Sequence, residues 1–92
     1  NVSLPSSLQS IGIGAFWGCT NLENVNVPSG VTQIGDDAFA DCSSLVSVVI
    51  PPQVTSIGDN AFGGCDKLVI KCAEGSAAHT YAVENLIEFE LI

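Results

Sequence analysis

Hydrophobic and polar positions recur along this chain with a period of 23 residues. Three short segments have apolar residues at alternate positions, which suits inward and outward alternation, and a proline follows each: residues 2–4, 25–27 and 48–50. Alternation with period two is typical of a strand with one buried face, and proline cannot continue a strand's hydrogen bonds. The pattern therefore predicts three short strands, one in each period.

The same offset relates seven columns of identical or similar residues. The unit V-x-[LVI]-P-x-x-[LV]-x-x-I-G-x-x-A-F-x-x-C-x-x-L-x-x occurs three times, without insertion or deletion, between Val2 and Val69. A unit this short cannot bury its own hydrophobic side, so the units must stack as the coils of a solenoid. Strands repeated in register lie about 4.8 Å apart, which turns each inward column into a ladder of like side chains. We predict short parallel strands on the concave face of this solenoid.

The second half of each unit carries the Ile-Gly and Ala-Phe columns. In two units Ala-Phe is preceded by aspartate and a second aspartate or asparagine, Asp36-Asp37 and Asp59-Asn60. Aspartate is a common helix N-cap, so the pattern predicts a short helical turn on the convex side of each coil. The fold class is therefore α/β.

The chain departs from the unit after its third occurrence. Residues 68–72 form a strand segment with one residue fewer than the template. A helix is predicted over residues 77–84, with Ser76 as its N-cap and Asn85 as its stop.

The final segment has the period of a strand. Ile87, Phe89 and Leu91 alternate with glutamates, which predicts one buried face. We divide the chain into three 23-residue repeats over residues 1–69 and a C-terminal helix-strand cap over residues 70–92.

The repeat is similar to a known class. Residues 31–45 and 54–68 both read V-T-x-I-G-x-x-A-F-x-x-C-x-x-L, which closely resembles the BspA-like leucine-rich repeats. Residues 75–85, G-S-x-A-x-x-Y-A-x-x-N, are similar to a segment that often ends such arrays. The resemblance implies a non-catalytic scaffold for adhesion or protein-protein binding, extracellular or at a bacterial cell surface. Its partner would be a host or bacterial surface protein or glycan. The alternative is a purely structural spacer or capping segment of a larger surface protein.

Composition removes several classes of function. Ten acidic residues against two basic ones give a formal charge of −8, which repels phosphate backbones and makes nucleic acid an unsuitable partner. No window approaches the roughly 18 to 20 apolar residues of a membrane helix, so no membrane insertion is expected. Because the chain lacks methionine and opens within the repeat pattern, we expect it to be a segment of a longer precursor.

Three of the four cysteines form a column, Cys19, Cys42 and Cys65. With Cys72 they could supply thiolates to zinc, but zinc ligands converge on one point at about 2.3 Å, whereas a stacked column holds them parallel. Buried free cysteines are the preferred interpretation. Disulfides between neighbouring coils stay open, because adjacent Cα atoms would lie within the permitted range. We expect no metal and no cofactor.

Two other groups have a chemical interpretation. Cys72 and His79 could act as nucleophile and base, but no third orienting group stands at a recognisable spacing, so we expect no catalytic residue. Asp36 stacked over Asp59 could hold calcium. The spacing of dedicated calcium loops is absent, and helix capping explains the same residues.

The outward positions of the strands form the candidate binding face, which is uncharged in the three repeats: Ser3, Asn24, Asn26, Ser47 and Val49. Such a strip offers hydrogen bonds and shallow apolar contact to an extended polypeptide or glycan, and solenoids commonly bind on this side. A merely solvated face is the alternative.

Two features of the first coil stand apart. Trp17 breaks its column, since alanine and glycine occupy the equivalent positions. It either contacts a partner as an exposed aromatic or packs against the flank of the first coil. Residues 2–4 begin the repeat with nothing before them, so we expect self-association through this N-terminal edge.

Overall fold

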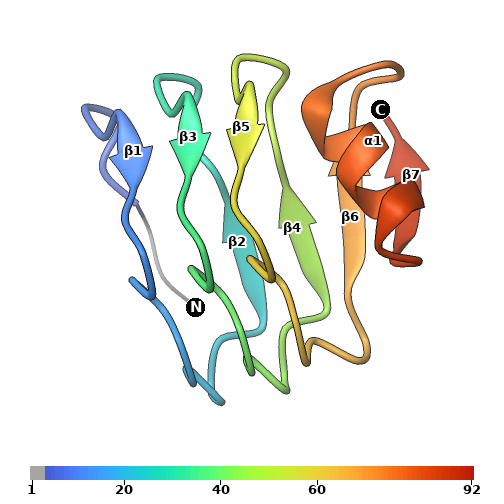
Figure 1. The fold of residues 1–92 in the computed structure, drawn as a ribbon. Coiled ribbons are helices and arrows are strands. Elements are labelled where there is room, and N and C mark those ends of the chain that lie inside the picture. Colours follow the sequence, from blue (N-terminus) through green and yellow to red (C-terminus); the bar gives the residue numbers. More distant parts are fainter. Residues whose placement is uncertain (1–3) are drawn as a thin grey trace.

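In the computed structural model, which describes residues 4–92, the chain winds into a solenoid with two parallel sheets (Figure 1). One sheet has the order β1 (Ser10–Ile11), β3 (Gln33–Ile34) and β5 (Ser56–Ile57). The other has the order β2 (Asn24–Asn26), β4 (Ser47–Val49), β6 (Val69–Cys72) and β7 (Glu88–Leu91). The helix α1 (Ala77–Glu84) connects β6 to β7. The predicted parallel-strand solenoid is confirmed.

Strand pairing follows the period of the sequence. Ile11 pairs with Ile34 in the smaller sheet, and Val25 pairs with Val48 in the larger one. From β4 to β6 the offset is one residue shorter, because Val48 pairs with Ile70. The shortening of the repeat by one residue, predicted for this part of the sequence, is therefore confirmed.

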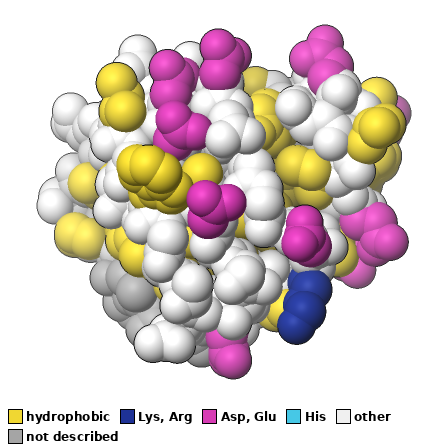
Figure 2. All heavy atoms as spheres, turned by 60° about the horizontal axis from the view of Figure 1, so that its bottom comes forward, with side chains coloured by type: hydrophobic (Ala, Val, Ile, Leu, Met, Phe, Trp, Pro, Cys, Tyr) yellow, Lys and Arg dark blue, Asp and Glu magenta, His cyan; other side chains and the backbone are white. Residues whose placement is uncertain are grey.

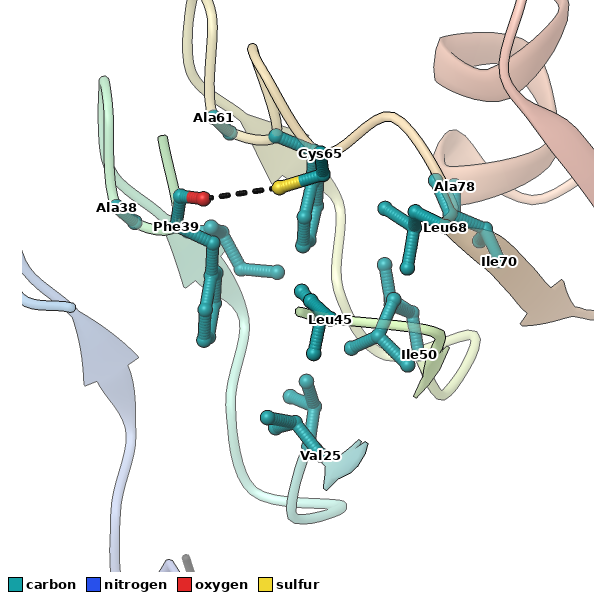
Figure 3. Close-up of a cluster of buried hydrophobic side chains, with 14 of the residues drawn as sticks. Val25, Ala38, Phe39, Leu45, Ile50, Ala61, Cys65, Leu68, Ile70 and Ala78 are labelled. Carbon is teal, nitrogen blue, oxygen red and sulfur yellow. Dashed lines mark hydrogen bonds between the residues drawn. The ribbon is translucent and has the colours of Figure 1, made fainter. Parts of the chain in front are cut away.

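A stack of aromatic rings runs through the interior. Phe39 is fully buried between Phe16 and Phe62, with ring centroids 5.1 and 5.2 Å apart and interplanar angles of 7° and 3°. Columns of valine, leucine, isoleucine and alanine surround these rings (Figure 3). Among the described residues the buried set contains no polar or charged side chain. The predicted ladders of like side chains therefore form the core.

Turns follow β1, β3 and β5 in each coil, and the helical turns predicted there are wrong. Asp37 and Asp41 have φ angles of 57° and 59°, in the left-handed region. Their equivalents in the other coils also have positive φ: Gly14, Gly18, Asn60 and Gly64. A left-handed residue interrupts an α-helix, whereas glycine, asparagine and aspartate tolerate this conformation in turns. These aspartates and asparagine are therefore turn residues and not helix N-caps.

The turn segments are joined by backbone hydrogen bonds that share one direction. The amides of Asp37, Phe39 and Asp41 donate to carbonyls of the next coil over 3.1, 2.7 and 2.7 Å. The amides between them close turns within their own coil, and the first coil repeats the arrangement. In the turn segments, the amides that bond between coils therefore point toward the C-terminal end of the stack. In the third coil, the equivalent donors face the cap.

The C-terminal cap supplies an acceptor to that third coil. The hydroxyl oxygen of Tyr81 accepts a hydrogen bond from the amide of Phe62 at 3.2 Å, and the two rings meet edge to face. The predicted helix is confirmed over Ala77–Glu84. Its N-cap Ser76 accepts from the amide of His79, and Asn85 is its C-cap. The helix packs against β5, β6 and β7.

The last strand forms where the alternation predicts it, but the expectation of one buried face is wrong. Phe89 is 37% exposed and Leu91 is 47% exposed. Each pairs with an inward residue of β6, Phe89 with Ile70 and Leu91 with Cys72. Among the described residues no coil stacks beyond β7, so α1 alone shields them. A helix of eight residues is only about 12 Å long and covers them in part.

Two expectations stay predictions. The strand over residues 2–4 falls mainly on Val2 and Ser3, which lie outside the described residues, and Leu4 is not in a strand. Self-association through that edge is therefore untested. The boundary between repeats and cap at residues 69 and 70 also stays a prediction. β6 pairs with β4 in one sheet, so no break in the sheet marks this boundary.

Truncation of the central ring should test the coil register. We expect Phe39→Ala to lower the free energy of unfolding by about 3 to 5 kcal/mol, because it leaves a cavity between two rings. Phe89→Ala is the control and should cost less than about 2 kcal/mol, because its ring is already partly in water. Denaturant unfolding measures both. Equal losses would show that the stack does not carry the core.

Removal of one hydroxyl should test the cap. We expect Tyr81→Phe to cost about 1 to 3 kcal/mol, because the buried Phe62 amide loses its acceptor while the ring packing remains. Hydrogen exchange at that amide should accelerate along with the loss of stability. An unchanged exchange rate would show that the amide finds its partner elsewhere.

Candidate binding face and chemical groups

The outward side chains of β2 and β4 form one continuous surface, here called the sheet face: Asn24, Asn26, Ser47 and Val49. They alternate with the buried Val25 and Val48, as the sequence pattern predicts. The strand register sets Asn24 beside Ser47 and Asn26 beside Val49. The Ser47 hydroxyl donates to the Asn24 side-chain oxygen at 2.6 Å. The fifth predicted residue, Ser3, lies outside the described residues.

Beyond the sheet face, the outward surface of the same sheet continues onto β6 and β7, whose residues were not among the predicted site residues. Lys71 pairs with Val49 on one side and with Glu90 on the other. Val69 lies in the same way between Ser47 and Glu88. The surface is therefore neutral over two strands and charged over the next two. Alternation marks these residues in the sequence, but the intervening helix hides the pairing of β6 with β7.

Trp17 lies on the turn side of the first coil and not on the sheet face. Its side chain is 65% exposed, and its indole N–H donates to the Asp41 carboxylate of the next coil at 3.2 Å. Ile13, in the same series of turns, is 79% exposed. The indole is thus hydrogen-bonded through its N–H while most of the side chain remains exposed. Contact with a partner through Trp17 stays a proposal.

The cysteine column bonds coil to coil. The Cys42 thiol donates to the Phe16 carbonyl at 3.2 Å, and the Cys65 thiol donates to the Phe39 carbonyl at 3.1 Å (Figure 3). All four cysteines are free thiols in the structure. Burial raises the pKa of Cys42 and raises that of Cys65 to about 11. These thiols are therefore poor nucleophiles and poor metal ligands at neutral pH.

The aspartates of the turns also bridge coils. Asp36 accepts from the amide of Asp59 at 2.8 Å, and Asp37 accepts from the side-chain amide of Asn60 at 2.8 Å. Within residues 4–92, no three His, Cys, Asp or Glu side chains gather as metal ligands would. The acidic column acts as an acceptor for the neighbouring coil, in place of the helix capping expected from the sequence.

Cys72 and His79 are both engaged in the cap. Cys72 is fully buried, and desolvation raises the pKa of its thiol. His79 packs its ring on Phe89, with centroids 4.8 Å apart, and its Nδ1 accepts from the amide of Gly75 at 2.9 Å. One imidazole nitrogen is thus occupied by the start of the helix, which gives His79 a structural role.

A cleft of about 580 Å³ lies between the third coil and the cap. Its walls are the turns around Gly64 and Lys67 and the residues that follow α1, from Asn85 to Glu88. Leu86 stands on the cap side, 93% exposed and with φ of 57°. Its amide bonds to Val83 and that of Ile87 to Ala82, the hydrogen bonds with which glycine usually ends a helix. This cleft could not be predicted from the sequence, because it forms between segments that are separated along the chain.

On the face drawn in Figure 2, acidic side chains outnumber basic ones, in line with ten acidic and two basic residues in the chain. Hydrophobic side chains are exposed between them. Within the described residues, none of the helical structure is long and apolar enough to cross a membrane.

Stacked parallel coils with a constant register define a repeat solenoid with an extended sheet surface. The family model for the BspA-type leucine-rich repeat region (six copies) matches residues 1–77, so the chain belongs to this family. The family indicates a repeat scaffold for surface or protein-protein interaction. Comparisons with curated proteins and with solved structures gave no match.

The buried thiols should make stability depend on pH in the alkaline range. Unfolded thiols ionise near pH 9, whereas Cys65 keeps its proton to about pH 11, so stability should fall as pH rises through that interval. Burial raises the pKa of Tyr81 as well, which acts in the same direction. We expect Cys65→Ala to flatten part of this decline in thermal midpoints measured from pH 7 to pH 10.5. Identical slopes in both proteins would contradict the assignment.

Proposed function

We propose that this chain is a non-catalytic binding scaffold whose sheet face contacts a surface protein or glycan in bacterial adhesion. The supporting observation is the geometry of that face, where outward asparagine, serine and valine side chains repeat at the spacing of the strands. A neutral surface of this kind suits an extended polypeptide or glycan, whose hydrogen-bonding groups also repeat along one direction. An extracellular or cell-surface location belongs to the same proposal.

Family membership supports the proposal at the level of a scaffold. The core columns restrict the inward residues to apolar side chains, whereas the outward residues of each strand are at least partly exposed and can change with less loss of packing. Recognition through these outward positions therefore costs the scaffold little stability.

Charge placed on the sheet face should abolish binding. We expect Asn26→Arg with Val49→Arg to prevent retention of the chain on immobilised host matrix proteins or glycans, because two bulky cations cover the neutral strip. Gln33→Arg with Ser56→Arg is the matched control, because these residues also pair in register and are exposed, on the smaller sheet. Equal retention of the two double variants would rule out the sheet face as the binding surface.

A structural spacer is the second candidate, and one observation favours it. Several exposed side chains bond the equivalent position of the next coil, for example Ser47 to Asn24 and Asn60 to Asp37. Polar groups used in this way stiffen the stack and are less available to a ligand. If the chain binds none of the immobilised probes while the wild-type fold is intact, the spacer function is favoured.

We also propose that the chain has no catalytic activity. The two residues that could act as nucleophile and base, Cys72 and His79, are respectively buried and bonded to the helix start. No turnover of ester or peptide substrates is expected, and activity lost on Cys72→Ala or His79→Ala would contradict this.

A further inference from the structure

The outer edge of β7 carries unpaired backbone groups. The amide of Ile92 donates to the carbonyl of Cys72 at 2.9 Å, so alternate residues of this strand, including Glu90, direct their backbone groups toward β6. The N–H and C=O groups of Phe89 and Leu91 therefore point away from β6. No strand within residues 4–92 pairs with that edge. An edge of this kind is a template for an added extended chain.

The side chains of β7 give this edge two different faces. On the inward side, Phe89 and Leu91 are both more than one third exposed and continue the apolar columns of the core. On the outward side, Glu88 and Glu90 are both exposed. An added strand would therefore meet apolar groups at every second residue and carboxylates at the residues between.

We propose that the free edge of β7 binds an extended peptide as a fifth strand of the larger sheet, and that the peptide alternates apolar and basic residues. Backbone hydrogen bonds to Phe89 and Leu91 would hold the peptide, and its apolar side chains would cover those two residues. Lysine or arginine between them would lie opposite Glu88 and Glu90, and cross-strand pairs of opposite charge are favourable. This binding mode does not use Asn24, Asn26, Ser47 or Val49.

A second copy of the chain is a poorer occupant of this edge. Antiparallel pairing of Phe89 in one copy with Leu91 in the other sets Glu90 opposite Glu90 of the second copy. Like charges directly opposite each other destabilise a strand pair. The net charge of −8 on each copy adds to the repulsion. The edge therefore selects a basic partner over itself.

The first test uses two synthetic peptides, an octapeptide of alternating valine and lysine and the same peptide with glutamate in place of lysine. We expect only the lysine peptide to bind, with slower hydrogen exchange at the amides of Phe89 and Leu91. Absence of binding, equal binding of both peptides, or binding without protection of these two amides would each overturn the proposal. Sedimentation detects the alternative occupant, a second copy, which would also overturn it.

The second test uses variants with matched controls. Glu88→Lys with Glu90→Lys should weaken binding of the lysine peptide by about tenfold or more, whereas Glu74→Lys with Glu84→Lys makes the same charge change outside β7 and should weaken it less. Leu91→Pro should abolish binding by removing an outward N–H, and Leu91→Ala should retain most of it. The sheet-face variant Asn26→Arg with Val49→Arg should bind this peptide normally, which separates the failure of one proposal from that of the other. Equal effects of the two charge pairs would refute an edge site.

Discussion

The directional hydrogen bonding between coils is the constraint on which the rest of this structure depends. On the turn side, alternate amides such as those of Phe39 and Asp41 reach carbonyls of the next coil, while the others close turns within their own coil. This alternation needs left-handed residues at fixed places, which Asp37, Asp41 and their equivalents supply. A single inserted residue would shift every donor against its acceptor. The 23-residue period of the three repeats is therefore required by the backbone hydrogen bonds as well as by the core.

Much of the fold could be predicted from the sequence because the repeated columns report which residues must face inward. The strands around Val25 and Val48, the helix that begins after Ser76 and the missing residue before β6 all follow from pattern alone. The turn conformation could not be predicted in the same way. Aspartate is favoured at a helix N-cap and also tolerates a left-handed turn, and only the donors and acceptors of the neighbouring coil distinguish the two.

The candidate site was predictable to a lesser extent, for a related reason. Asn24, Asn26, Ser47 and Val49 meet because their strands repeat in register, and repetition is visible in the sequence. Lys71 and Glu90 meet because β7 pairs with β6 across a helix, where the period no longer holds. The exposure of Phe89 and Leu91 could not be predicted either, since alternation shows which residues share a face but not what covers that face. Sequence periodicity thus predicts contacts within the array better than contacts at its end.

The cap offers the backbone amides of the third coil a different hydrogen-bond acceptor from the one that a further coil would offer. A further coil would offer a row of carbonyls, whereas α1 offers one hydroxyl, that of Tyr81, to the amide of Phe62. In the larger sheet the reverse holds, since β7 pairs with β6 as a further coil would and leaves its own outer edge unpaired. On the turn side, the cap therefore replaces the hydrogen bonds of a further coil. On the other side, it extends the larger sheet by one strand. The acidic residues of β7 stand along this outer edge. They disfavour pairing with the same edge of another copy and favour an extended chain that carries basic residues.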